Sequence, residues 1–253
     1  MQSSRFSCVR LAACLGVAAS LVACGSREDT SERRNRSSAD ATSSRPSIAA
    51  NGAAANQGDP RIVVLGDSLT AGLGLPLEDA YPAVLQRQVD AKGLKYQVIN
   101  AGNSGDTSAA GLSRLDWALD GDVRVLIVAL GANDGLRGLP VSQLKDNLAR
   151  IIQRAQGRGI TVVMAGMEAP PNWGDDYTKA FHEVYPELAK QYRVALVPFL
   201  LEGVAAIERL NQRDGIHPTA EGDRIVADNV WKVLEPVLTA RAAGGQPTGA
   251  PKS

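Results

Sequence analysis

The sequence Val-Arg-Val-Leu-Ile-Val-Ala-Leu occupies residues 123–130 and is the strongest strand signal in the chain. Such near-continuous apolar runs are typical of strands buried on both faces of a parallel sheet. A polar, glycine-rich turn, Gly131-Ala132-Asn133-Asp134-Gly135, follows it directly. Residues 123–130 are therefore predicted to form a buried strand that ends in a polar loop.

Strand-like and helix-like segments alternate on both sides of this strand. Shorter apolar runs predict further strands at Arg61–Leu65, Tyr96–Asn100, Ile160–Gly166 and Val194–Phe199. Helical spacing of apolar residues predicts helices at Pro76–Ala91, Ser108–Leu119, Pro140–Gln156, Tyr177–Gln191 and Ala220–Leu238. The alternation predicts an α/β protein with a single three-layer α/β/α domain over residues 60–240, in which a five-stranded parallel sheet has a flavodoxin-like arrangement.

Composition excludes several classes of function. The chain has 253 residues, no net charge and only 4% aromatic residues, which argues against a basic or base-stacking nucleic-acid surface. All three cysteines, Cys8, Cys14 and Cys24, lie in the first 24 residues, so the domain has no disulfide and no thiolate metal site. No cluster shows metal-ligand spacing, and neither a metal nor another cofactor is expected.

The N-terminus has the features of an export signal. Arg5 and Arg10 precede an apolar stretch over residues 11–23, which is shorter than the roughly 20 apolar residues of a membrane span. The stretch ends in Leu21-Val22-Ala23-Cys24, which resembles a bacterial lipobox. Residues 1–23 are therefore predicted to be a lipoprotein signal peptide, with Cys24 lipidated. The alternative is an ordinary cleaved signal peptide followed by a chance cysteine.

The segments that flank the domain are poor in large apolar residues. Residues 24–59 are predicted to be a disordered tether, and the Ala/Gly/Pro-rich residues 241–253 a disordered tail. Lipidation at Cys24 would anchor the protein in the cell envelope, facing the periplasm. In a Gram-negative cell, Gly25 and Ser26 after that cysteine favour the outer membrane. A monomer is the default expectation.

The loops after the strands carry the candidate chemistry, because sites in parallel sheets form beyond the carboxyl ends of the strands. Gly66-Asp67-Ser68-Leu69 follows the first strand, and it places Ser68 either as a nucleophile or simply as a helix cap. Asp67 is expected to brace the loop by accepting hydrogen bonds. Gly105 follows the second strand, where its N–H can approach a ligand closely or merely form a turn. Asn133 follows residues 123–130 as an oxyanion donor or an Asx-turn residue.

The two histidines of the chain have different surroundings. His182 lies in a predicted helix and is expected to be a surface or satisfied residue. His217 follows Asp214 by three residues, so that the carboxylate can accept from the imidazole and fix its tautomer. A nucleophile, an oriented base and an oxyanion site are together the parts of nucleophilic acyl transfer.

These motifs resemble the blocks of the SGNH or GDSL hydrolases over residues 61 to about 238. Gly66-Asp67-Ser68-Leu69 resembles the first block, Gly105 the glycine of the second, Gly131-Ala132-Asn133-Asp134 the third, and Asp214-Gly215-Ile216-His217-Pro218 the last. The resemblance implies a triad of Ser68, Asp214 and His217. It also implies an oxyanion hole made by the N–H groups of Ser68 and Gly105 and the amide of Asn133.

Within the family, the resemblance is to the bacterial thioesterase I/protease I/lysophospholipase L1 group, which includes arylesterases. It extends to Pro170-Pro171-Asn172-Trp173-Gly174, which corresponds in that group to a mobile loop beside the acyl chain. Asp175 and Asp176 depart from the group there, and they argue against a carried-over preference for anionic substrates such as acyl-CoA. Leu73, Trp173 and Ile216 are candidates for an acyl groove, although such residues can equally be core or loop packing.

The resulting expectation is a carboxylic ester hydrolase of the esterase, lysophospholipase or acyl thioesterase type, acting on a small-molecule or lipid substrate through an acyl-enzyme. One alternative is a carbohydrate or lipid O-deacetylase, or an acyltransferase, of the same fold. Another is a non-catalytic lipid-binding lipoprotein. A nucleotide-binding protein is disfavoured, because the first loop has no Walker-type lysine and no dinucleotide fingerprint.

Overall fold

The computed structural model describes residues 58–242 and residue 244, so the predicted signal peptide, Cys24 and nearly all of the predicted tether and tail lie outside the described residues. Five parallel strands form one sheet in the order β2-β1-β3-β4-β5. This is the order of flavodoxin-like sheets and confirms the predicted α/β fold class. The strands are β1 (Arg61–Gly66), β2 (Gln97–Gly102), β3 (Val123–Ala129), β4 (Thr161–Ala165) and β5 (Ala195–Val197).

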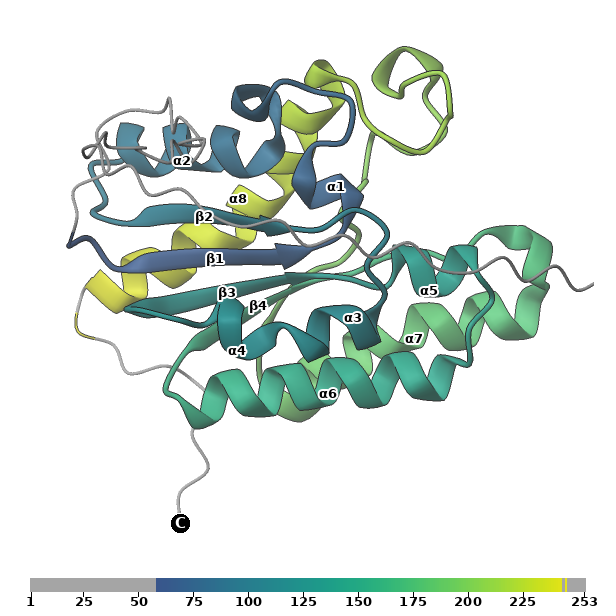
Figure 1. Cartoon of the computed structure of the whole chain (residues 1–253), viewed down its shortest axis with the longest axis horizontal. Coiled ribbons are helices and arrows are strands. Elements are labelled where there is room, and N and C mark those ends of the chain that lie inside the picture. The colour runs from purple at the N-terminus through teal and green to yellow at the C-terminus, as the bar shows by residue number, and fades with distance from the viewer. Residues whose placement is uncertain (1–57, 243, 245–253) are drawn as a thin grey trace, which may run out of the picture. The chain divides into compact units, whose positions relative to one another are not determined.

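Helices cover both faces of this sheet (Figure 1). One face carries α2 (Tyr81–Ala91) and α8 (Ala220–Ala242), which pack against each other. The other carries α3 (Ser108–Ser113), α4 (Leu115–Ala118), α6 (Val141–Gly157) and α7 (Asp175–Tyr192). Two short helices, α1 (Ser68–Ala71) and α5 (Ala132–Leu136), begin just beyond the carboxyl ends of β1 and β3. None of the helices in the described part of the chain is long and apolar enough to cross a membrane.

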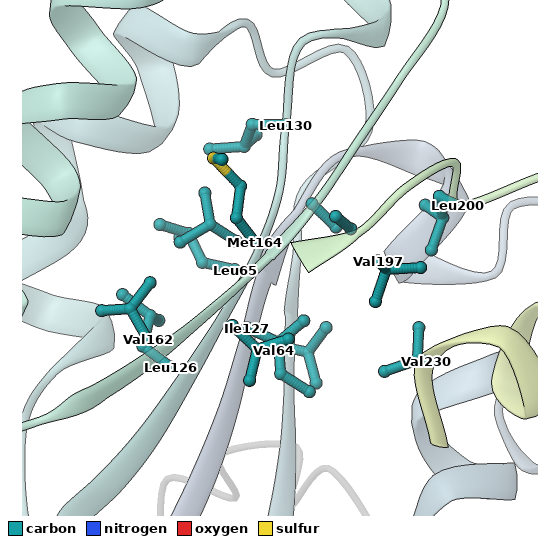
Figure 2. Close-up of a cluster of buried hydrophobic side chains, with 14 of the residues drawn as sticks. Val64, Leu65, Leu126, Ile127, Leu130, Val162, Met164, Val197, Leu200 and Val230 are labelled. Carbon is teal, nitrogen blue, oxygen red and sulfur yellow. The ribbon is translucent and has the colours of Figure 1, made fainter. Parts of the chain in front are cut away.

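The core is built on the apolar strands. Leu126 and Ile127 of β3 are fully buried, and they face opposite sides of the sheet because side chains alternate along a strand. Figure 2 shows Val64 and Ile127 on the side of Val230, which belongs to α8, while Leu65 and Leu126 point the other way. Burial on both faces explains why this strand lacks polar alternation.

The helix predicted over residues 76–91 corresponds to α2, which starts later than the sequence pattern predicts. Residues 77–79 form a single 3₁₀ turn, and Ala80 is extended, with ψ of 142°. The helix begins at Tyr81, whose backbone N–H donates to Oδ2 of Asp223 on α8 at 3.0 Å. Pro82 then occupies the first turn, where no N–H is needed. The predicted start at Pro76 was therefore wrong, because the cap of this helix comes from a distant segment.

The predicted helix over residues 108–119 is divided in two at Arg114. That residue adopts φ of −104° and ψ of 8° between α3 and α4. Its guanidinium bonds to the carboxylate of Asp106 and to the carbonyl of Gly66, at the carboxyl end of β1. At the other end of the domain, α8 continues to Ala242 and thus includes two residues assigned to the tail.

Candidate active site

Ser68 is placed by a tight turn between β1 and α1. Gly66 ends the strand, and a Cβ atom there would lie 1.9 Å from Oγ1 of Thr70, so no larger residue fits. Oδ1 of Asp67 accepts from the N–H of Leu69 at 3.1 Å and caps the short helix that Ser68 begins. The turn presents the Ser68 hydroxyl at the carboxyl edge of the sheet.

A chain of hydrogen bonds connects Ser68 with the last loop before α8. Nε2 of His217 lies 2.9 Å from Oγ of Ser68, although the two residues are 149 positions apart in the sequence. Nδ1 of His217 lies 2.7 Å from Oδ2 of Asp214. With the ring hydrogen on Nδ1 donated to the carboxylate, Nε2 is left to accept the serine proton. The structure thus brings together the three residues of the predicted triad.

Asp214 is held in its charged form by its own loop. Its Oδ1 accepts from the backbone N–H groups of His217 and Ile216, each at 3.0 Å. These bonds, that of His217 first, together with the imidazole, lower the pKa of Asp214 to about 2. The carboxylate therefore remains negative through the neutral range and can stabilise an imidazolium on His217.

Asp67 has a different environment from Asp214. Its side chain is 1% exposed, and burial raises its pKa to about 6, against the lowering effects of the Leu69 N–H bond and the charge of His217. Its short contacts are local ones that hold the turn, as the sequence predicted.

The predicted oxyanion donors come from two neighbouring loops. Nδ2 of Asn133, on α5, donates to the carbonyl of Asp106 at 3.0 Å and lies 3.5 Å from Oδ2 of Asp67. Gly105 adopts φ of 86°, a conformation that glycine adopts readily, and its carbonyl accepts from Nη2 of Arg137. Asn133 shares the wall of a cleft with Ser68 and His217, whereas Gly105 is not among the residues that line it.

That cleft is an open, mostly apolar cavity of about 220 Å³. Its walls come from the loops after β1, β3, β4 and β5 and from the loop that carries His217. The lining residues are Ser68, Leu69, Ala132, Asn133, Leu136, Met167, Glu168, Ala169, Pro170, Phe199, Leu201, Ala205, Ala206, Asn211, Gly215, Ile216 and His217.

Of the three groove candidates, only Ile216 lies in this wall. Trp173 packs elsewhere, with its ring 6.2 Å from that of Tyr177 and directly over Gly138. Leu73 is 46% exposed, and its carbonyl accepts from Nε2 of Gln212 at 2.7 Å. Most of the wall is therefore made of residues that the sequence did not single out, among them Leu136, Met167, Phe199 and Leu201.

The GDSL-like lipase/acylhydrolase family model matches residues 64–225 of the chain. The chain belongs to this family. It is therefore an acyl hydrolase, as the sequence predicted, and the matched region contains every residue of the hydrogen-bonded chain described above.

Individual members of the family are similar over most of the domain. The esterase TesA of Pseudomonas aeruginosa is 44% identical over 178 residues, which cover 70% of this chain and 89% of that protein. The thioesterase 1/protease 1/lysophospholipase L1 of Escherichia coli (strain K12) is 38% identical over 178 residues, covering 70% and 84%. A crystal structure of TesA superposes with a TM-score of 0.68 at 43% identity, covering 70% of this chain and 99% of that one.

This acylhydrolase also has supporting residues that sequence reasoning missed. Asp106 is 6% exposed, and its carboxylate accepts hydrogen bonds from Nε of Arg114 at 2.5 Å and from Nδ2 of Asn103 at 2.6 Å. These bonds fix the backbone carbonyl of Asp106 that Asn133 contacts. Asp134 accepts from the N–H and hydroxyl of Ser108 and so joins α5 to α3. Asp106 is adjacent to Gly105 and could have been noticed, but no local pattern points to Arg114.

Gln212 is a second such residue. Its N–H donates to the carbonyl of His217 at 2.7 Å, and its Nε2 donates to the carbonyls of Pro218 at 2.9 Å and Leu73 at 2.7 Å. It thereby joins the loop of the imidazole to the segment that follows Ser68. Among residues 58–242 and 244, no group of three or more His, Cys, Asp or Glu side chains is arranged to hold a metal ion.

Proposed function

We propose that this acyl hydrolase cleaves ester and thioester bonds through an acyl-enzyme formed on Ser68. The observation that carries the proposal is the chain of hydrogen bonds from Asp214 through His217 to Ser68, which ends in the wall of the apolar cleft. A nucleophile, a base within 2.9 Å and a carboxylate that orients the base are the arrangement required for nucleophilic acyl transfer.

In the first half of the reaction, Nε2 of His217 removes the hydroxyl proton as Oγ of Ser68 attacks the acyl carbonyl. Asp214 stabilises the resulting imidazolium, and its lowered pKa keeps it ionised. The imidazolium then returns the proton to the departing alcohol or thiol. In the second half, His217 deprotonates a water molecule that attacks the acyl-serine ester, and Ser68 regains its proton as the carboxylic acid leaves.

The developing oxyanion is stabilised by the backbone N–H groups of Ser68 and Gly105 and by the amide of Asn133. Donors that are fixed before the reaction lower the barrier without reorganisation. The bonds of the Asn133 amide to Asp106 and of the Gly105 carbonyl to Arg137 provide this fixation. The apolar cleft receives the acyl chain, whose burial supplies about 0.8 kcal/mol for each methylene.

The test is hydrolysis of a 4-nitrophenyl ester series, from acetate to palmitate, by the full chain and by its Ser68→Ala variant. Ser142→Ala, an exposed serine on α6, is the matched control. We expect turnover in the native and control proteins, its loss in Ser68→Ala, and labelling of Ser68 by a fluorophosphonate. If Ser68→Ala retains full turnover, or if no ester is hydrolysed and the probe labels nothing, the proposal is wrong and a lipid-binding role becomes the better interpretation.

We further propose that the enzyme is a monomer anchored in the cell envelope by lipid on Cys24, facing the periplasm. The support is the Leu21-Val22-Ala23-Cys24 sequence after an apolar segment, because two or more acyl chains give stable membrane attachment. In a Gram-negative host, a palmitate analogue should label the full chain but not its Cys24→Ala variant. Equal labelling of both proteins would contradict the anchor.

A further inference from the structure

The described residues that line the cleft beside Ser68 include a negatively charged side chain but no lysine or arginine. Of the residues that line it in the described part of the chain, one is a carboxylate, Glu168, and none is a lysine or arginine. The remaining wall is apolar or uncharged, apart from the imidazole of His217. Glu168 is therefore the one carboxylate that a substrate contacts directly among the described lining residues.

Glu168 is held in place by a contact outside the proposed reaction path. It follows β4, and its Oε1 lies 2.6 Å from Nδ1 of His182 on α7. The Glu168 side chain is 41% exposed and that of His182 is 54% exposed, so neither charge is deeply buried. This hydrogen bond restricts the position of the carboxylate.

Arg137 keeps its positive charge but does not line the cleft. It follows the lining residue Leu136, and its Nη2 donates to the carbonyl of Gly105 at 2.8 Å. Asp175 and Asp176 begin α7, the helix that carries His182, and they add further negative charge on that side.

We propose that Glu168 is a specificity-determining residue that selects substrates by charge, rejecting acyl groups with an anionic end and accepting neutral or cationic ones. The inference rests on the proposed function, since it concerns the same cleft. A unit charge several ångströms from a partly exposed carboxylate changes an interaction by about tenfold in equilibrium terms. Discrimination between competing substrates is measured by kcat/KM.

The experiment uses the full chain and three 4-nitrophenyl esters with six-carbon acyl groups, at about pH 8, where histidine is ordinarily neutral. The hexanoate is neutral, the adipate monoester ends in a carboxylate, and the trimethylammonio-hexanoate ends in a cation. We expect kcat/KM for the adipate to be about tenfold lower than for the hexanoate. Glu168→Gln should remove most of this difference in the ratio of the two kcat/KM values, and Glu168→Lys should favour the adipate over the cationic ester.

Glu183→Gln is the matched control, because Glu183 is an exposed carboxylate of α7 beside His182 that does not line the cleft. It should leave the ratio of adipate to hexanoate hydrolysis unchanged. The proposal is overturned if the native protein hydrolyses both esters equally well, if Glu168→Gln leaves the ratio unchanged, or if Glu183→Gln shifts it as much. Failure of the proposed function would be seen separately, as hexanoate hydrolysis that is absent or that survives Ser68→Ala.

Discussion

At the scale of single residues, the amide of Asn133 serves two purposes in the proposed mechanism. One of its hydrogens is donated to the carbonyl of Asp106 at 3.0 Å, which fixes the side chain. The second bond, to Oδ2 of Asp67 at 3.5 Å, is at the long limit for a hydrogen bond, so it is weak and an oxyanion can replace it. The bond to Asp106 orients the side chain before the substrate arrives.

The Asn133→Ala variant separates these two purposes. We expect turnover to fall about 10²–10³-fold, because one oxyanion donor is lost. The free energy of unfolding should fall by only about 1 kcal/mol, because the Asp106 carbonyl loses its partner. Ester hydrolysis and denaturant unfolding measure the two effects.

The control for this prediction is Asn147→Ala. Nδ2 of Asn147 donates to Oγ of Ser108 at 3.0 Å, and the residue does not line the cleft. It should lose a comparable hydrogen bond without losing turnover. Native turnover in Asn133→Ala would remove Asn133 from the oxyanion scheme.

How far the site could be predicted depended on how local each signal was. Asp214 and His217 are three residues apart, and their pairing could be inferred from that spacing alone. The walls of the cleft could not, because the direction of an exposed side chain depends on distant packing. Trp173 packs against Gly138 and Tyr177. The side chain of Gln212 donates a hydrogen bond to the backbone carbonyl of Leu73 and so fixes that segment.

At the scale of elements, Asp223 joins α8 to the start of α2. The two residues of its bond to Tyr81 are 142 positions apart, which explains why the pattern of residues 76–91 alone placed the start of the helix too early. Asp223 is 1% exposed, and burial raises its pKa to about 7, with the charge of Asp79 adding to the shift. The division between α3 and α4 has a similar cause, since Arg114 is held by the end of β1 and by Asp106 in the loop after β2 rather than by its own helix.

Asp223 makes the stability of the domain depend on pH. Its carboxyl binds a proton more tightly in the folded protein than in the unfolded chain, so it favours folding at low pH. This contribution is lost as the pH rises from the ordinary value of 3.8 through about 7. Asp223→Asn keeps an acceptor for Tyr81 and removes the titration.

The free energy of unfolding of Asp223→Asn, relative to the native protein, should therefore increase by about 2–3 kcal/mol between about pH 5 and about pH 8. Urea unfolding at several pH values measures this difference. A flat difference for Asp223→Asn would mean that its carboxyl titrates normally in the folded protein.

At the scale of the whole domain, one cluster of buried side chains includes residues from all five strands and from helices on both faces of the sheet. The layered architecture was predictable, because near-continuous apolar runs such as residues 123–130 require helices on both faces of the sheet to bury them. The chain reversals at the carboxyl edge were less predictable. α1 and α5 are four and five residues long, too short to show a helical period.

Ile127→Ala tests how much the packing of β3 contributes to the free energy of unfolding. The side chain is fully buried in β3, and its truncation should lower the free energy of unfolding by about 2–5 kcal/mol. For a domain of this size, each kilocalorie corresponds to a fall of about 2–4 °C in Tm, which calorimetry would measure. Leu77→Ala, at a side chain that is 74% exposed, should change Tm by little. Equal effects of the two substitutions would contradict this account of the core.

In the proposed mechanism, the separation of 149 residues in sequence between Ser68 and His217 also determines when the enzyme becomes active. A ribosome adds about 5–20 residues each second, so roughly 7–30 s pass between the synthesis of the nucleophile and that of its base. Throughout that interval the growing polypeptide has the serine without its base, so the proposed reaction on an ester cannot take place. Activity begins only after His217 has been added, and a translation product that stops before that residue is inactive.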